Sequence, residues 1–272
     1  MIRILVGSFA GVVVLVVVWL LVAGRNFERA VSDDIERIEE SEAAETGEFD
    51  RLPALLRQYV ERSGLSPGES FRSTRIRQEG EIKLGEDAEW QSFTATQWFS
   101  VGRPAFVWKP SMPMPVGSVK GVDRLDRDGG RLEMRIFGAI PVANESGPDI
   151  LKAQLLRYLA ELAWVPPAMV ANEQISWEQT DPRTLRATAS IGDASAEIDV
   201  HFDTKGDIVE VESEGRPRDE DGETVERPWG GTFSEYREFD GIRVPTRAEV
   251  YWDLPDGRFT YFRARVTNFS TQ

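Results

Sequence analysis

Beyond Ser63 the chain alternates apolar and polar residues with a period of two, which is typical of strands that place one face on a core. The alternation is clearest at 92–99, 132–136 and 196–202. Tight-turn signals separate such stretches: Asp128-Gly129-Gly130, Ile191-Gly192-Asp193, Asp203-Thr204-Lys205-Gly206, Asp221-Gly222, Asp240-Gly241 and Asp256-Gly257. These turns join neighbouring antiparallel strands. The pattern predicts an α+β fold: a curved antiparallel β-sheet, a half-barrel-like meander of roughly ten to twelve strands, with a few packing helices.

Two segments have helical periodicity instead. The first is Leu52 to Arg62, with Pro53 in its first turn. The second begins near Ser146-Gly147-Pro148-Asp149 and carries an apolar stripe at Leu151, Leu155, Tyr158, Leu159 and Leu162. Because proline lacks an amide donor, we expect Val165-Pro166-Pro167 to end this helix.

The N-terminus carries an uninterrupted apolar run. The 21 residues from Ile4 to Gly24 contain no charge and are flanked by Arg3 and Arg25. A helix of about 20 residues spans a bilayer, so the run predicts a single transmembrane anchor. The alternative is a cleaved signal peptide, but the run exceeds the usual ~7–15 residues of such a segment.

The sequence predicts three parts: an anchor at 1–25, an acidic stalk or linker at 26–50, and one half-barrel-like domain at 51–272. Residues 26–48 show no convincing apolar stripe, and we interpret them as a solvated spacer. The protein is thus expected at the cell membrane, with a single pass. Counting positive charges alone would hold the domain in the cytoplasm, but acidic neighbours surround those arginines, and we expect an extracytoplasmic domain.

Some strands are apolar on both faces, notably 249–254 and 258–266. One face can rest on helices, while the other lines a concave interior or belongs to a double-sided core. Trp164 lies away from the apolar stripe of the second helix, together with Arg157 and Glu161. It either packs under the next strand near Ile175 and Trp177, or it forms the rim of a cavity in which Arg157 and Glu161 orient a mostly apolar ligand. The candidate ligand-binding residues are Arg157, Tyr158, Glu161, Trp164, Trp108, Trp177, Tyr251 and Tyr261.

Four segments resemble a bacterial family of uncharacterised function. They are EWQSFTATQ (89–97), RYLAELAWVPP (157–167), RDEDGE (218–223) and DGIRVPTRAEVYWDLPDGRFTYFRARV (240–266). The resemblance covers most of the chain from about Leu52 and implies no catalytic residues. The meander-plus-helix plan is also similar, as a fold, to the lipoprotein-carrier half-barrels of bacterial envelopes, in which a curved sheet and a helical lid enclose an acyl-binding cavity. The apparent anchor and the lack of a lipidated cysteine depart from secreted carriers.

Composition narrows the function classes. The chain has 46 acidic and 32 basic residues, a net charge of -14, so it is a poor partner for nucleic acid. It has no cysteine, which excludes disulfides, thiolate metal sites and a cysteine nucleophile. The eight tryptophans suggest large buried or ligand-facing rings.

No catalytic motif is present. His201 is the single histidine, on the polar side of an alternating strand, and no G-x-S-x-G elbow, Walker loop or G-x-G-x-x-G fingerprint occurs. Asp219 to Glu223 resembles part of a calcium loop, but Pro217 and Pro228 stand where the first and twelfth ligands belong, so we expect a hairpin turn. We expect neither a cofactor nor a metal.

These observations favour a membrane-anchored binding or carrier module for an apolar, lipid-like ligand. Two alternatives remain: a structural or interaction protein of the cell envelope, and a hydrolase that uses carboxylates in the cavity. An empty apolar cavity would favour the binding module. An exposed apolar patch would favour the structural or interaction protein.

Overall fold

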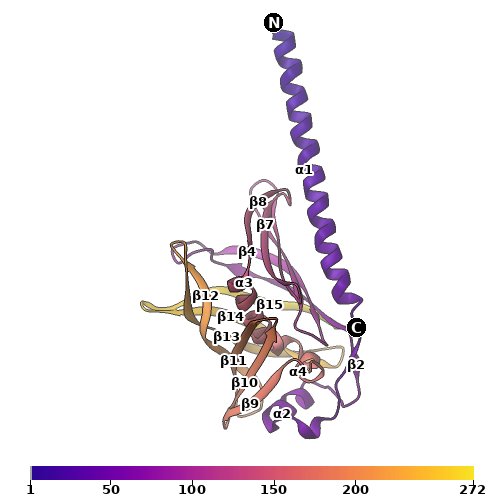
Figure 1. Cartoon of the computed structure of the whole chain (residues 1–272), viewed down its shortest axis with the longest axis vertical. Coiled ribbons are helices and arrows are strands. Elements are labelled where there is room, and N and C mark those ends of the chain that lie inside the picture. Colours follow the sequence, from indigo (N-terminus) through magenta and orange to yellow (C-terminus); the bar gives the residue numbers. More distant parts are fainter. Residues whose placement is uncertain (1) are drawn as a thin grey trace.

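The computed structural model describes residues 2–272, with side chains from Val14 onward (Figure 1). The protein has an α+β fold dominated by one open antiparallel sheet of 13 strands, slightly more than the ten to twelve expected. Its strands are β3 (Ser73–Ile82), β4 (Gln91–Ser100), β5 (Phe106–Pro113), β6 (Ser118–Asp126), β7 (Gly129–Ile136), β8 (Ile140–Ser146), β9 (Ser176–Asp181), β10 (Thr184–Ile191), β11 (Ala194–Phe202), β12 (Ile208–Glu220), β13 (Glu223–Phe239), β14 (Ile242–Leu254) and β15 (Gly257–Thr271).

The sheet consists of two meanders that meet at its centre. Its order is β8-β7-β6-β5-β4-β3-β15-β14-β13-β12-β11-β10-β9. Chain neighbours therefore pair along each arm, and the Asp-Gly signals do form the turns, with positive φ at Gly192, Gly222, Gly241 and Gly257. The one long-range pairing joins β3 to β15, for example Thr74 to Thr271.

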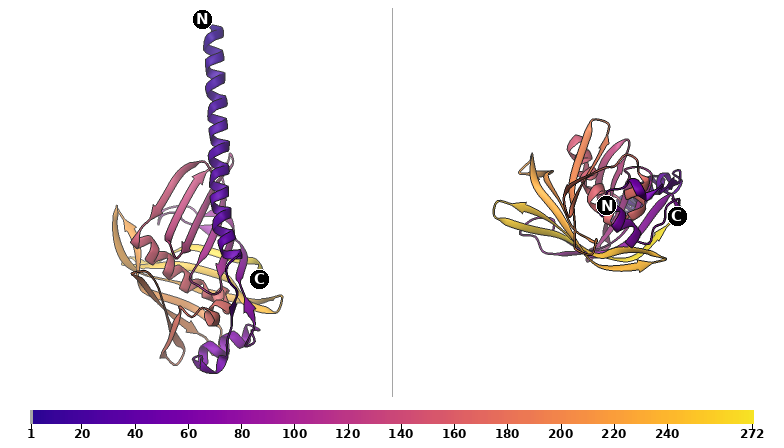
Figure 2. Two further views of the ribbon diagram at one scale, coloured as in Figure 1. Left: turned by 45° about the vertical axis from the view of Figure 1, so that its right-hand side comes forward. Right: turned by 90° about the horizontal axis from the view of Figure 1, so that it is seen from below.

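Helix α3 (Pro148–Ala160) connects the arms and contacts strands of both, from β6–β8 to β10–β13, so it lies across the inner face of the curved sheet (Figures 1 and 2). It continues into the 3₁₀ turn η2 (Glu161–Trp164) and the short helix α4 (Pro166–Ala171). The prediction that Pro166 and Pro167 end the helix is therefore wrong in detail. The α-helix has already ended at Ala160, and the prolines begin α4, where a missing amide donor costs nothing.

The main core lies between α3 and the inner face. Tyr158, Leu155 and Leu159 of the predicted stripe are fully buried there. Helix α2 (Ala54–Arg62) closes the lower end with Leu56 and Tyr59 (Figure 1). Around α2 lie the 3₁₀ turn η1 (Phe49–Arg51) and the two-stranded sheet of β1 (Ala44–Glu45) and β2 (Ser70–Phe71).

Helix α1 (Ile2–Glu39) packs on the opposite, outer face of the sheet, along β4 and β5. A second apolar cluster forms there from Phe27, Val31 and Ile38 of α1 with Val107 and Val122 of the sheet. The expectation of a solvated spacer therefore does not hold for residues 26–39. These apolar residues recur at helical spacing between the acidic ones and are buried.

The N-terminal part of α1 projects beyond the sheet (Figures 1 and 2). In the part of the chain with described side chains, none of the helices combines the length and apolar character that crossing a bilayer requires. Residues 4–13 of the predicted anchor, Ile4–Gly24, lie outside that part, so the anchor stays a prediction.

Candidate functional site

A cavity of about 230 Å³ lies between the end of α3 and the inner face of the sheet. Its wall is mostly apolar, with side chains from η2 and from strands of both arms: Ile82, Trp164, Val211, Phe233, Val250 and Phe262. A few polar residues also line it, namely Asp123, Arg157, Glu161, Arg216, Glu249 and Tyr261. An apolar cavity with few convergent polar groups is the usual form of a small-molecule site.

Arg157 is the centre of the polar group. Its Nη1 donates to Oδ2 of Asp123 at 2.5 Å, and its Nε donates to Oε1 of Glu161 at 2.9 Å. The guanidinium also lies 4.8 Å from the ring centroid of Trp108 and 5.1 Å from that of Phe106. Because α3 places Arg157 and Glu161 one turn apart, the helix itself pre-forms half of this cluster.

Neighbouring amides complete the cluster. Gln154 donates to Oδ1 of Asp123, and Gln97 Nε2 donates to Oε2 of Glu161 at 2.6 Å. All four carboxylate oxygens thus accept a hydrogen bond from the protein. The two acids are held as counterions of Arg157, and this arrangement does not provide a free acid–base pair of the kind that glycoside hydrolysis uses.

Burial has the largest effect on the pKa of Asp123. It raises the pKa of this carboxyl to about 6, although Arg157 and Arg216 lower it. Conversely, the charges of Glu161 and Asp123 raise the pKa of Arg157 in spite of its burial, so this guanidinium stays charged. The cavity therefore contains a fixed cation next to an acid that titrates near neutral pH.

Arg216 differs from Arg157 in its partners. Its Nη1 donates to the Tyr261 hydroxyl at 3.1 Å, and its guanidinium lies 4.3 Å from the ring centroid of Trp229. The Nε atom is buried and has no hydrogen-bond partner in the described part of the chain. Within residues 14–272 this arginine forms no ion pair with a carboxylate, so its charge faces the cavity without a counterion of its own.

Trp164 closes the cavity at the C-terminal end of α3. Its indole N–H donates to the Pro245 carbonyl at 3.0 Å, and its ring meets Phe233 edge-on at 5.6 Å. The tryptophan is therefore anchored to β14 and forms part of the cavity wall beside Glu161.

The structure brings five of the eight predicted ligand-binding residues to this cavity: Trp108, Arg157, Glu161, Trp164 and Tyr261. The other three lie elsewhere. The Tyr158 hydroxyl accepts a hydrogen bond from Asn172 within the core, and Trp177 donates to the Met169 carbonyl. Tyr251 lies on the outer face, where its hydroxyl donates to Glu210 at 2.7 Å.

Asp123 and Arg216 were not predicted. Asp123 pairs across the strands with Trp108, while Leu125 two residues later pairs with Phe106, so this acid occupies an inward position of β6. A charged residue on the apolar face of an alternating strand is the signal that could have identified it. Arg216 follows an irregularity in the β12–β13 register, and no local pattern marks its direction.

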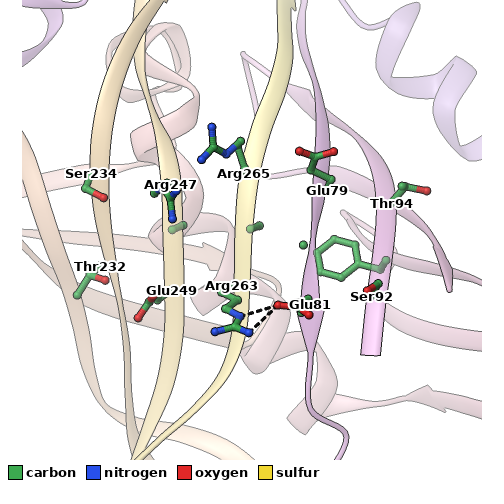
Figure 3. A pocket seen from close by; sticks show the side chains of 14 residues that line it. Glu79, Glu81, Ser92, Thr94, Thr232, Ser234, Arg247, Glu249, Arg263 and Arg265 are labelled. Carbon is green, nitrogen blue, oxygen red and sulfur yellow. Dashed lines mark hydrogen bonds and ion pairs between the residues drawn. The ribbon is translucent and has the colours of Figure 1, made fainter. Parts of the chain in front are cut away.

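A larger hollow of about 830 Å³ lies on the outer face over β13, β14, β15, β3 and β4 (Figure 3). It is lined by alternating charges, among them Glu79, Glu81, Glu249, Arg247, Arg263 and Arg265. Arg263 bonds Glu81 in the pair drawn in Figure 3. These charges form cross-strand pairs on a solvated sheet face, so we place the candidate site in the inner cavity.

The remaining sequence candidates have structural roles. His201 Nδ1 lies 3.1 Å from the Thr184 hydroxyl, and Nε2 lies 3.1 Å from Glu212 on the next strand. Asp221 and Gly222 form the β12–β13 hairpin turn, with φ of 54° and 88°. Within the described residues no group of three or more acidic or histidine side chains is placed to hold a metal ion.

Solved structures with a similar chain trace are bacterial. A domain named for outer membrane lipoprotein sorting, from Vibrio parahaemolyticus, is 9% identical and matches with a TM-score of 0.44 over 80% of this chain and 91% of that chain. A LolA superfamily protein from Nitrosomonas europaea is 8% identical, with a TM-score of 0.42 over 80% and 92%.

The curated proteins contain no match to this chain. A family model does match, over residues 42–264, which is most of the chain. This match confirms the resemblance seen in the four sequence segments. The chain belongs to a family of unknown function, DUF6544.

Proposed function

We propose that this protein is a membrane-anchored binding module whose inner cavity takes one apolar chain that carries an anionic head group. The observation that carries the proposal is the cavity itself, with its aromatic and aliphatic wall and the Arg216 Nε, which has no hydrogen-bond partner in the described part of the chain. The chain would lie against Trp164, Phe233 and Phe262. The head group would pair with Arg216.

The size of the cavity limits the ligand. A volume of about 230 Å³ equals the room of roughly eight water molecules at ~30 Å³ each. It is smaller than the ~300–1,000 Å³ of typical drug-sized sites. In this conformation the cavity therefore fits one medium-length chain rather than a bundle of several.

An unsatisfied donor, and not net charge, favours an acceptor head group. Arg157 and Arg216 are matched in number by Asp123 and Glu161, and both of these acids pair with Arg157. A ligand carboxylate or phosphate would supply the acceptor that the Nε of Arg216 lacks.

The anchor is part of the proposal. The side chains from Val14 to Trp19, together with Leu21 and Val22, are each about half exposed or more, which is unusual for eight large apolar side chains in one helix. Together with the uncharged run from Ile4, this exposure supports a helix in a bilayer. The domain is proposed to lie outside the cytoplasm.

Calorimetric titration of a medium-chain fatty acid and its matched alcohol into residues 26–272 tests the ligand class. Ala160 lines the cavity, so Ala160→Leu fills part of it and should weaken both ligands by at least about tenfold, which is 1.4 kcal/mol. Arg216→Gln should weaken the acid and leave the alcohol unchanged. Tyr251→Phe, on the outer face, should bind both as the parent does.

The proposal is rejected if neither ligand binds, or if Tyr251→Phe weakens binding as much as Ala160→Leu does. Equal loss of acid and alcohol in Arg216→Gln would reject the anionic head group alone. Thermal unfolding of each variant separates lost binding from lost folding.

A further inference from the structure

Two neighbouring hairpin turns expose large apolar side chains. In the β5–β6 turn Val116 is 73% exposed, and at the β7–β8 turn Phe137 is 44%, Ile140 40% and Val142 55% exposed. The turns touch, because the Phe137 N–H donates to the Ser118 carbonyl at 2.9 Å and its ring covers Gly117 so closely that a Cβ there would overlap it. We name Val116, Phe137, Ile140 and Val142 the turn cluster.

Phe137 is unusual in its backbone as well as its exposure. Its φ of 56° is in the left-handed region, which bulky residues rarely adopt and which Gly or Asn occupies at lower cost. Since the ring is also half in solvent, burial within the domain does not offset this cost. A contact outside the domain would account for an apolar ring at this position.

Helix α1 passes directly beside the cluster. An ideal Cβ on Gly24 would lie 3.4 Å from the Phe137 carbonyl oxygen, and one on Gly138 would lie 3.8 Å from the Gly24 Cα. The helix and the turn are thus in van der Waals contact at Gly24 and Gly138. Figure 1 shows the β7–β8 tip at the side of α1, near the middle of the helix.

The same level of α1 marks a change in surface chemistry. On the N-terminal side of Gly24 the exposed side chains are apolar, from Val14 to Val22. On the other side Arg25 and Arg29 are exposed, while Phe27 packs on the sheet. The turn cluster therefore continues the apolar surface of the helix at the point where that surface ends in arginines.

We propose that the turn cluster inserts into the interfacial region of a lipid bilayer beside α1, with Arg25 and Arg29 at the level of the phosphates. Apolar side chains next to basic ones are the composition that favours such a position. The second contact would hold the domain in one orientation on the membrane, in place of free rotation about the helix. The inference rests on the anchor of the proposed function and is independent of the cavity ligand.

Depth-dependent quenching tests this orientation in the full-length protein. Because the chain has no cysteine, Ile140→Cys, Val142→Cys, Trp19→Cys and Asp128→Cys each give a single site for an environment-sensitive fluorophore. Asp128 is the control, since its side chain is 77% exposed in the β6–β7 turn, at the opposite end of those strands. The variants are reconstituted in phosphatidylcholine–phosphatidylglycerol vesicles that contain nitroxide lipids, labelled either near the head group or at the chain end.

Labels at 140 and 142 should be quenched by the shallow nitroxide, the label at 19 by the deep one, and the label at 128 by neither. If 140 and 142 are no more quenched than 128 while 19 is quenched, the docking is wrong and the anchor stands. If 19 is unquenched but 140 is quenched, the cluster reaches the membrane without the helix, which overturns both the anchor and the two-contact orientation. A blue-shifted but unquenched label at 140 and 142 would show a protein contact and overturn the membrane as the occupant.

Discussion

Removing Arg157, the cation at the centre of the polar cluster, should lower the free energy of unfolding more than removing a similar cation on the surface. In Arg157→Met the carboxylates of Asp123 and Glu161, whose side chains are 8% and 12% exposed, lose their shared partner. Breaking a buried ion pair in this way typically costs about 3–5 kcal/mol.

The titration of Asp123 places the expected loss at the lower end. Its pKa is about 6 with Arg157 present, and losing that cation raises the pKa further, so protonating Asp123 in the variant at pH 7 costs at most about 1.4 kcal/mol. We therefore expect a loss of about 3 kcal/mol at pH 7, or a fall in Tm of roughly 6–12 °C at ~2–4 °C per kcal/mol. The loss should be smaller at pH 5, where Asp123 is already protonated.

Urea unfolding of residues 26–272, followed by tryptophan fluorescence at both pH values, measures this loss. The matched control is Arg263→Met, which removes a pair with Glu81 whose side chains are 47% and 38% exposed, and which should cost at most about 1 kcal/mol. Equal losses for the two variants would contradict this prediction, because they would mean that water solvates the Arg157 cluster and that the cavity is not dry.

Three further predictions concern other parts of the fold. Folding raises the pKa of Asp123 from its usual 3.8 to about 6, so its contribution to stability is fully present below pH 3.8 and is lost as pH rises through about 6. The free energy of unfolding of Asp123→Asn, measured against pH, should lack this dependence. Gly80→Ala should lower the Tm by several degrees, since its Cβ would lie 2.2 Å from the Arg263 carbonyl oxygen, whereas Gly85→Ala, with its nearest neighbour at 4.0 Å, should leave it unchanged. Val31→Asp should release α1 from the outer face, because this side chain is only 1% exposed, and should speed proteolysis between residues 26 and 42. Ala30→Asp, on the exposed side of the helix, should leave the rate of proteolysis unchanged.

Local patterns predicted the elements well because local physics determines them. The alternation at 92–99 is β4, and each Asp-Gly pair does join two consecutive strands. The junction of the two arms through β3 and β15 could not be predicted, since it depends on a pairing of residues almost 200 positions apart. The packing of α1 was missed although Phe27, Val31 and Ile38 have helical spacing, because the acidic residues between them dominated the interpretation.

The site was predicted only in part for a similar reason. Arg157, Glu161 and Trp164 share one helical segment, so their spacing alone indicated that they act together. Tyr251 was misplaced because β14 is apolar on both faces, so its alternation with Val250 and Trp252 does not indicate which of the two faces lines the cavity. Arg216 reaches the cavity from the far arm of the sheet, and only the curvature of the whole sheet brings it there.

We propose above that the inner cavity holds an apolar chain with an anionic head group. Photo-crosslinking of the full-length protein with a diazirine fatty acid, followed by peptide mapping, tests it most directly. We predict adducts on the wall of the cavity, at η2 and β13 around Trp164 and Phe233, that an unlabelled fatty acid displaces and that Arg216→Gln reduces. Adducts confined to Val14–Val22, with none on the cavity wall, would contradict the account.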